Sequence, residues 1–395
     1  MRKDVLTKYF FIFVAALSSG YALMPIYPSY IMAILLLSLV AISFFIDRLR
    51  FNFSVLLFLI TTLLVGYVSS FQSEVNFSAI IKLQIIIMFS YFFVNVITYR
   101  DFVKCYVYFM LSLSVGSLIL YSTVNFTNLG IDSIFPVVTN SNEMSYHNLY
   151  VMFYFASEFI QYRNTGFFWE PGIFSSYLSL AILLIGHGKF EREKLITSIL
   201  VLTVFTTYST GGYILMFMAL MSRFLKSNIR TYLLLVCCTV FMVVVVTFSN
   251  ESISLLRIWF PEVTNKFFVS ESRSVIDRFT SPLINLEAFS NSPVFGMGLN
   301  EVNLLYSTKG DFAQSSTVTY YLGAFGFLGL SYFFMIIKGT VFSPSEKFDN
   351  IKGIVALVFI LSMVNKEPHM FFCLTYITIF YWALDASGKE IRSEV

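Results

Sequence analysis

The 395-residue chain has few charged residues, few cysteines and few histidines. Charged residues make up 12% of it, whereas a soluble domain usually carries about 25%. Hydrophobic residues account for 57%, and 46 of the residues are phenylalanine. The scarcity of charge excludes an ordinary soluble domain. It predicts an all-α polytopic membrane protein that forms a single integral membrane domain over residues 1–395.

Cysteine, histidine and the common cofactor motifs are equally sparse. The four cysteines all lie in apolar runs: Cys105, Cys237, Cys238 and Cys373. This placement argues against a disulfide framework and against a thiolate metal site. The three histidines are scattered, and no phosphate-binding loop, dinucleotide fingerprint or zinc-ligand cluster is present. The sequence therefore predicts neither a metal nor a cofactor.

Apolar segments long enough to cross a membrane recur along the whole chain. A hydrocarbon core of about 30 Å needs about 20 apolar residues per helix. We expect about twelve spans, several of them short, at residues 9–27, 29–46, 51–71, 78–98, 104–122, 172–187, 195–208, 211–224, 231–249, 316–337, 352–365 and 370–385. With both termini in the cytoplasm, most of the 26 lysines and arginines fall on the inner side, as basic loops require.

Two segments test this topology. Residues 195–224 could form one helix or two, because Ser209 to Gly212 could be a turn or a break inside a helix. Two spans keep the basic loop 223–230 on the inner side, so we expect two. The aromatic stretch Ser145–Gln161 would reverse the topology if it crossed the membrane. We expect it to be an interfacial or re-entrant helix on the outer face.

Two long outer segments remain, at about 123–171 and 250–315, and every other loop is short. Long loops in compact proteins are usually functional or disordered. These two contain aromatic residues, prolines and charges of both signs, which argues against disorder. Any chemistry is therefore expected on the outer face.

The stretch RNTGFFWEPGIF at the end of the first outer segment is the leading candidate site. The guanidinium of Arg163 can bind phosphate oxygens bidentately. Glu170 directly precedes Pro171, which is a favourable first residue of a helix. A helix cap and a snorkelling arginine would explain the same residues without any function. Trp169 would serve an interfacial aromatic belt more readily than sugar stacking.

The second outer segment and the loop at Asn140 supply further candidates. Arg273 and Arg278 flank Asp277, and a helix there would make Arg273 and Asp277 an i,i+4 pair. The turn that ends at Gly298 could let the backbone approach a ligand, or could be an ordinary loop turn. Polar side chains in NSNEMSYH could bind sugar hydroxyls or could form a solvated loop. They are Asn140, Asn142, Glu143 and His147.

These features together resemble the O-antigen polymerase (Wzy) family, within the O-antigen ligase and polymerase superfamily. The likeness covers about residues 140–335 and rests on the order of three motifs. They are RNTGFFWEPG at Arg163–Gly172, YSTGGYILMFMAL at Tyr208–Leu220, and NSPVFGMGLNEV at Asn291–Val302 followed by YYLGAFGFLGL. The Ser-Thr-Gly-Gly break lacks the arginine that many relatives carry there, which puts its role in doubt.

The resemblance implies a GT-C-like, metal-independent membrane glycosyltransferase. Such enzymes polymerise undecaprenyl-diphosphate-linked oligosaccharide repeats into O-antigen or a related surface polysaccharide. The implied location is the bacterial inner membrane, with the active site on the periplasmic face. Its implied partners are these lipid-linked substrates, membrane lipids, a chain-length regulator and a flippase, with no nucleic acid.

The resemblance also assigns roles to residues. Arg163 and Arg278 match the arginine positions of the family and would stabilise the diphosphate leaving group. Glu170 would be the base, a sugar ligand or only a helix cap. The remaining candidates would bind substrate: Arg273, Asn140, Glu143, His147, Trp169, Gly298 and Asn300.

Three alternatives stay open. An O-antigen ligase would transfer the polymer to lipid A-core, but ligase relatives tend to have a histidine late in the large outer loop, and residues 250–315 contain none. A transporter of lipid-linked sugars would need ionisable residues along a central path, and Lys82 is the main such residue in the predicted spans. A glycosyltransferase using a polyprenyl-monophosphate sugar would carry an acid in the first outer loop, which Ile26–Ser29 lacks.

Overall fold

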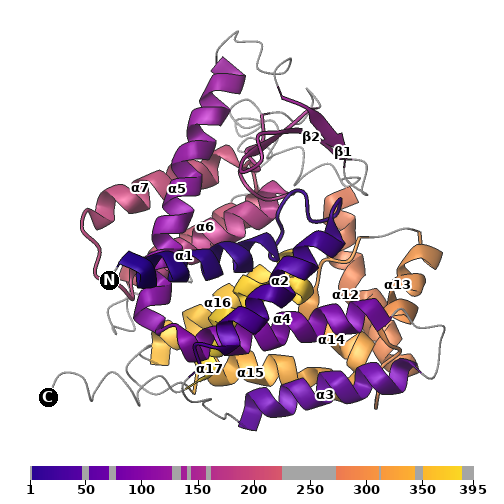
Figure 1. Ribbon diagram of the computed structural model, residues 1–395. Helices are drawn as coiled ribbons and strands as arrows, with labels where there is room; N and C mark the ends of the chain where they lie inside the picture. Colours follow the sequence, from indigo (N-terminus) through magenta and orange to yellow (C-terminus); the bar gives the residue numbers. More distant parts are fainter. Residues whose placement is uncertain are drawn as a thin grey trace, which may run out of the picture.

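The computed structural model describes residues 2–46, 53–70, 77–126, 135–139, 144–156, 162–224, 273–310, 313–342 and 350–384. Most of these residues are helical (Figure 1). Asn140, Glu143 and the predicted span at 231–249 lie outside the described residues. The mostly helical architecture agrees with the predicted all-α class.

The helices of the first half are α1 (Arg2–Leu17), α2 (Pro28–Ser43), α3 (Phe53–Ser70), α4 (Phe77–Val96), α5 (Tyr99–Phe126), α6 (Pro171–Ile185), α7 (Glu193–Thr206) and α8 (Thr210–Phe224). Those of the second half are α12 (Arg273–Asn291), α13 (Leu299–Thr308), α14 (Thr317–Phe325), α15 (Leu330–Thr340), α16 (Asn350–Lys366) and α17 (Cys373–Ala383). Two 3-10 turns are η2 (Gly326–Gly329) and η3 (His369–Phe371).

Three described helical segments are long and apolar enough to cross a membrane: Ser78–Val96, Tyr99–Phe126 and Thr317–Thr340. Four shorter apolar helices accompany them, namely Val5–Leu17, Pro28–Ser43, Pro171–Ile185 and Cys373–Ala383. The third long segment is not one continuous helix. Gly326 has a φ of +60°, which ends α14 at Phe325, and α15 begins only after the η2 turn. The span predicted at 316–337 coincides with this segment, which the η2 turn divides into two helices.

The first predicted span, at 9–27, is helical only in its first half, because α1 ends at Leu17. The hydroxyl of Ser18 bonds back to Ala15 O at 3.0 Å, and Gly20 adopts a φ of +108° that turns the chain. The following turns hold the Arg163–Glu170 stretch in place. Ala22 N donates to Phe167 O at 3.2 Å, and Trp169 N donates to Gly20 O at 3.0 Å.

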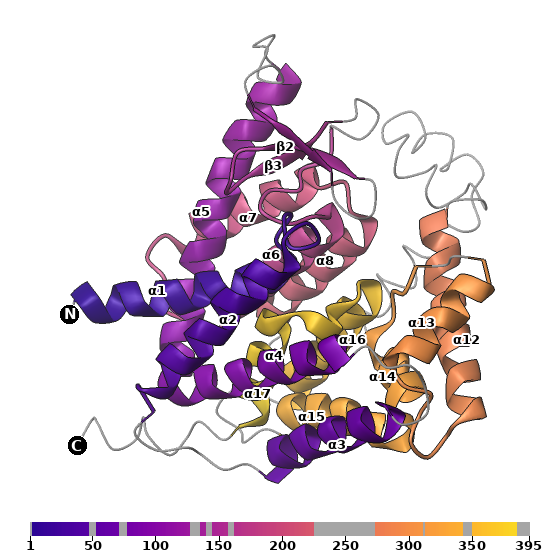
Figure 2. The same cartoon turned by 45° about the vertical axis from the view of Figure 1, so that its right-hand side comes forward.

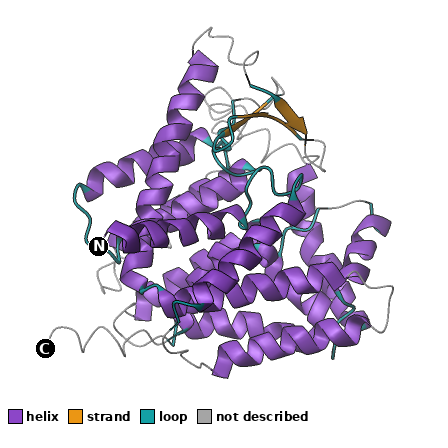
Figure 3. Cartoon of the chain, viewed as in Figure 1, coloured by secondary structure: helices purple, strands orange, loops and turns teal. Residues whose placement is uncertain are grey.

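The described part of the aromatic stretch Ser145–Gln161, which ends at Ala156, forms strands and not the expected helix. A three-stranded antiparallel sheet contains β1 (Val137–Thr139), β2 (Ser145–Asn148) and β3 (Phe153–Phe155), in that order (Figure 3). Aromatic residues favour strands because they pack well on a pleated, half-buried surface. Tyr146 and Phe155 stack with their ring centroids 5.1 Å apart on one face of the sheet.

Helix α6 lies at the centre of the fold, and every residue of it is buried. It packs against α5, α7 and α8, all of which are labelled in Figure 2. Its first residue, Pro171, agrees within one residue with the predicted start at 172. Because α6 is buried on all sides, the residues at its N-terminus are fixed by helices from both halves of the chain.

Residues 195–224 form two helices, as the charge distribution predicted. Tyr208 takes a left-handed φ of +48° between α7 and α8, and the hydroxyl of Ser209 accepts a bond from Gly212 N at 3.3 Å. The glycine pair lets α8 approach its neighbours closely. A Cβ at Gly212 would overlap Ser175, and one at Gly211 would lie 2.8 Å from Cδ and Cε of Lys366.

We expect Gly212→Ala to destabilise the protein by about 1–3 kcal/mol, the usual cost of overpacking a tight interior. The short side chain of Ser175 has no room to move away, since it belongs to buried α6. Gly186→Ala is the matched control, because the nearest atom to its Cβ would lie at an ordinary 3.4 Å. Thermal unfolding in detergent should separate the two variants, and equal melting temperatures would contradict this packing.

Candidate functional site at the N-terminus of α6

The loop that carries Arg163 is anchored beside the end of α7. Asn164 N donates to Thr206 O at 2.9 Å, and Asn164 Nδ2 donates to Thr206 Oγ1 at 3.0 Å. Arg163 itself is half-buried. Its Nε atom has no hydrogen-bond partner among the described residues, and its guanidinium interacts electrostatically with the hydroxyl of Tyr213 on α8. The fold thus holds a cation here without engaging all of its donors.

Glu170 and Trp169 occupy different environments. Glu170 is the N-cap residue of α6, as the sequence suggested, but its side chain makes no capping hydrogen bond. Its carboxylate is half-buried. Trp169 is held at its backbone by Tyr146, whose hydroxyl donates to Trp169 O at 2.5 Å. The Trp169 ring packs edge-on against Phe372, with centroids 5.5 Å apart. Trp169 therefore has packing contacts within the protein, whereas Glu170 makes no cap bond.

The end of α16 and the short connector to α17 bring three further ionisable residues to this place, which the sequence did not reveal. Lys366, Glu367 and His369 are 7%, 6% and 0% exposed. Lys366 Nζ donates to Gly172 O at 2.8 Å and to Ser175 Oγ at 2.9 Å. We call Glu170, Lys366, Glu367 and His369 the α6 N-terminal cluster. One sequence signal could have revealed it, because the dipeptide Glu-Pro occurs only at 170–171 and 367–368.

The two Glu-Pro carboxylates meet at Gly172. A Cβ at Gly172 would overlap Glu367 Oε1 and would lie 3.6 Å from Glu170 Oε1. The absence of a Cβ at Gly172 leaves room for the Glu367 carboxylate, whereas Glu170 would be in ordinary contact with a Cβ there. The first turn of α6 is also the positive end of the helix dipole, which favours anionic groups. Residues almost 200 positions apart thus place two carboxylates on the same turn.

His369 is locked in the connector as a neutral imidazole. His369 N donates to Thr317 Oγ1 at 2.8 Å, and His369 Nδ1 lies 2.8 Å from Thr375 Oγ1. Complete burial lowers its pKa to about 3, and the nearby charge of Lys366 acts in the same direction. The connector is therefore tied to α14 and α17 as well as to α6.

This pKa predicts a loss of stability in acid. In the unfolded chain the histidine has a pKa of about 6.5, so below that pH the unfolded state binds a proton that the folded state refuses. Stability is retained above pH 6.5 and falls as the pH drops toward 3, by about 2 kcal/mol at pH 5. We expect His369→Gln to remove this part of the pH dependence. Melting temperatures from pH 7.5 to 5 should fall less steeply in the variant than in the wild type, and parallel curves would contradict a neutral buried histidine.

Arg273 and Arg278 lie in the first turns of α12, but their side chains are outside the described residues. The expected Arg273–Asp277 pair is therefore untested, although Asp277 Oδ1 accepts a bond from Ala313 N at 3.2 Å. One turn after Arg278, the hydroxyl of Ser281 accepts bonds from Ser315 N and Ser316 N at 3.1 and 3.3 Å.

The same network continues to the cluster. Ser316 Oγ donates to Asn365 Oδ1 at 2.9 Å, and Asn365 directly precedes Lys366. A chain of hydrogen bonds therefore joins the first half of α12 to the end of α16, where Lys366 lies.

The other predicted site residues do not join the cluster. Gly298 and Asn300 lie at the start of α13, where Gly298 N donates to Ala324 O at 3.0 Å. A Cβ at the neighbouring Gly296 would overlap the backbone of Ala324, so this turn approaches its own chain. His147 is buried in β2 and stacks on Tyr154 at 4.7 Å. It follows Tyr146, which bonds Trp169, and successive strand residues point to opposite faces.

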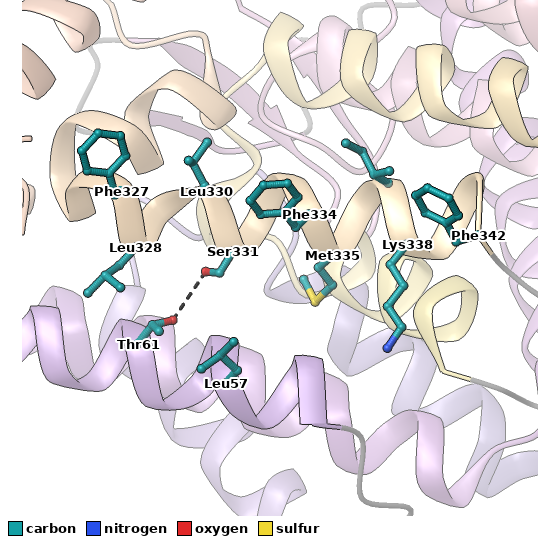
Figure 4. A pocket seen from close by; sticks show the side chains of 11 residues that line it. Leu57, Thr61, Phe327, Leu328, Leu330, Ser331, Phe334, Met335, Lys338 and Phe342 are labelled. Atoms are coloured by element: carbon teal, nitrogen blue, oxygen red, sulfur yellow. Dashed lines mark hydrogen bonds between the residues drawn. The ribbon is translucent and has the colours of Figure 1, made fainter. Parts of the chain in front are cut away.

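A separate hollow of about 490 Å³ lies between α3 and α15 (Figure 4). Its lining is almost entirely apolar, and Thr61 and Ser331 bond to each other across it at 3.4 Å. Lys338 is its one charged lining residue. The hollow shares no residue with the α6 N-terminal cluster. Among the described residues, no group of three or more metal-ligating side chains occurs.

The α6 N-terminal cluster thus combines two carboxylates, one buried lysine and one neutral histidine at the end of a buried helix, and half-buried Arg163 lies in the loop that leads to this helix. Such a set can bind an anion, orient a hydroxyl and accept a proton. Comparison with known proteins adds no assignment to this geometry: no protein-family model matches the chain, and no curated protein matches it significantly.

Proposed function

We propose that the protein is a membrane glycosyltransferase that polymerises polyprenyl-diphosphate-linked oligosaccharide repeats. In this proposal the chain crosses the bacterial inner membrane about twelve times, and both termini are cytoplasmic. The α6 N-terminal cluster and Arg163 face the periplasm. The repeats, carried on undecaprenyl diphosphate, are joined into O-antigen or a related surface polysaccharide. A chain-length regulator and a flippase are the protein partners this reaction calls for.

The observation that carries the proposal is where the ionisable residues gather. Glu170 precedes the first residue of α6, Lys366 is the last residue of α16, and Arg163 lies in the loop before α6. A transporter needs ionisable groups along a path through the middle of its helices. Charges collected at helix ends instead favour chemistry at one face of the membrane, which also argues against the flippase alternative.

The proposed reaction assigns each group a task. A hydroxyl of the incoming repeat attacks the anomeric carbon of the growing chain and forms the new C–O bond. The bond from that carbon to the diphosphate breaks, and its electron pair leaves with the diphosphate. Arg163 and Arg278 offset the negative charge that develops there, as preorganised donors do in other transferases. Glu170 either takes the hydroxyl proton or orients the hydroxyl for attack, in which case the departing diphosphate takes the proton.

Transfer to lipid A-core, the ligase reaction, is the second candidate. The absence of histidine from residues 250–315 favoured polymerisation. His369, however, reaches the cluster from another part of the chain, with its Nε2 atom unbonded among the described residues. A histidine therefore lies near Lys366 of this cluster, which weakens the argument against a ligase.

Deleting the gene in its native host separates the candidates. For a polymerase we expect the polysaccharide ladder to collapse to single repeats that still reach lipopolysaccharide. For a ligase, no repeat should reach lipopolysaccharide at all. Gel electrophoresis of the surface polysaccharide distinguishes the two results, with the gene restored on a plasmid as the control. An unchanged ladder in the deletion strain would refute both functions.

A further inference from the structure

Lys366 makes an unusual set of contacts for a buried lysine. Its ammonium donates to Gly172 O at 2.8 Å, to Ser175 Oγ at 2.9 Å and to Ser176 Oγ at 3.3 Å. All three acceptors belong to the first turns of α6, almost 200 residues away in the sequence. A buried side chain of α16 therefore forms hydrogen bonds with the N-terminal end of α6. The first of its acceptors, Gly172, lies two residues after Glu170.

The position of this ammonium group is expected to lower the stability of the fold. A helix N-terminus is the positive end of the helix dipole, where a cation is disfavoured. Removing an ammonium group from water carries a further penalty that a buried contact often does not recover. Glu367 brings a carboxylate to the same Gly172, although its Oε1 atom makes no hydrogen bond among the described residues. Well-packed apolar residues would fill the same space at a lower cost in folding free energy. Buried ionisable residues in a membrane protein therefore point to function.

The alkyl part of Lys366 is held as firmly as its ammonium. Gly211 of α8 packs so closely that a Cβ there would lie 2.8 Å from Cδ and Cε of the lysine. Lys366 therefore cannot swing away from α6 without displacing α8. The hydrogen bonds of the ammonium and the packing on Gly211 together restrict the side chain, as is needed to hold a neighbouring catalytic group in place.

We propose that Lys366 is a positioning residue that fixes the first turn of α6 and thereby the carboxylate of Glu170. Glu367 supplies the charge that lets the lysine remain protonated in the interior. The inference rests on the proposed glycosyl transfer, in which Glu170 faces the attacking hydroxyl. It assigns roles in that reaction to two further residues, Lys366 at the end of α16 and Glu367 directly after it.

The double variant Lys366→Met/Glu367→Gln separates positioning from charge balance. Lys366→Met alone should lower the melting temperature, because the carboxylate of Glu367 remains buried without the lysine. The double variant carries no uncompensated charge, so its melting temperature should return toward the wild-type value. We expect its kcat in a purified assay with lipid-linked repeats to stay about 10²-fold low, since a shift of about 1 Å in a catalytic group costs that much. Its KM should change little.

A second variant guards against a misfolded result. Ser175→Ala/Ser176→Ala removes two of the three acceptors with small, helix-favouring residues, and should also lower kcat while the protein stays folded. Lys194→Met, at an exposed lysine of α7, is the control that should change neither property. A wild-type kcat in the double variant or in the serine variant would overturn the positioning role. An unchanged ladder in the deletion strain would overturn the proposed function itself, so the two failures are distinguishable.

Discussion

Arg163→Ala should collapse the polysaccharide ladder to single repeats while the protein still reaches the membrane. Its guanidinium is half-buried beside α8, and its Nε has no hydrogen-bond partner among the described residues. A donor held ready in this way can bind the diphosphate as its charge develops. Removing one preorganised donor of this kind lowers kcat by about 10²–10³-fold. Ladder length in cells and turnover in a purified assay both measure the effect.

Two companion variants sharpen this result. Arg163→Lys keeps the charge but loses the planar, bidentate fork, so it should recover only part of the activity. Arg100→Ala removes an exposed arginine at the start of α5 and should leave the ladder unchanged. Arg278→Ala should resemble Arg163→Ala if both arginines bind the same diphosphate. A full-length ladder in both Arg163→Ala and Arg278→Ala would show that these arginines do not form the site.

Sequence patterns predicted the features that depend on neighbouring residues. The Glu-Pro-Gly order placed the start of α6 within one residue, because proline is favoured at the first helical position. Two helices, α7 and α8, occur where the balance of basic loops favoured two spans. In both cases the physical cause lies within a few residues of the feature. Glu170 was accordingly found at the N-cap position of α6.

Features set by distant contacts were missed. Lys366 and Glu367 looked like an ordinary short connector, because their acceptors at Gly172 and Ser175 lie in another part of the chain. The helix break at Gly326 lies within an apolar run, and hydropathy carries no information on backbone angles. It accompanies close packing on the loop that follows α12, since a Cβ at Gly326 would overlap the carbonyl of Pro293.

The strands at Ser145–Asn148 and Phe153–Phe155 were missed for a different reason. Their aromatic residues suit a helix at the membrane interface, but Tyr146, Phe153 and Phe155 are also good strand formers. Periodicity in so short a segment does not separate the two. Pairing with β1 settles the matter, because Val138 faces Tyr146 across the sheet.

Glu170→Ala should leave the fold intact and abolish most of the activity. As a helix cap it contributes little, because its side chain makes no capping hydrogen bond. As a base it would supply about 10²–10⁴-fold of the rate. We therefore expect an unchanged melting temperature together with a strongly shortened ladder. A large drop in melting temperature with normal turnover would instead assign Glu170 to the helix end alone.

Glu170→Gln and Glu170→Asp then separate the two catalytic roles. Glutamine keeps the shape and can still hydrogen-bond a sugar hydroxyl, but it cannot take up a proton. Aspartate keeps the charge and withdraws it by one methylene, so a base would retain part of its activity. If Glu170 is the base, Gln should be as inactive as Ala and Asp partly active. If it only orients the sugar, Gln should be the more active variant. Because Glu367 meets the same glycine, Glu367→Gln should accompany both measurements, to show that the second carboxylate has not taken over the proton.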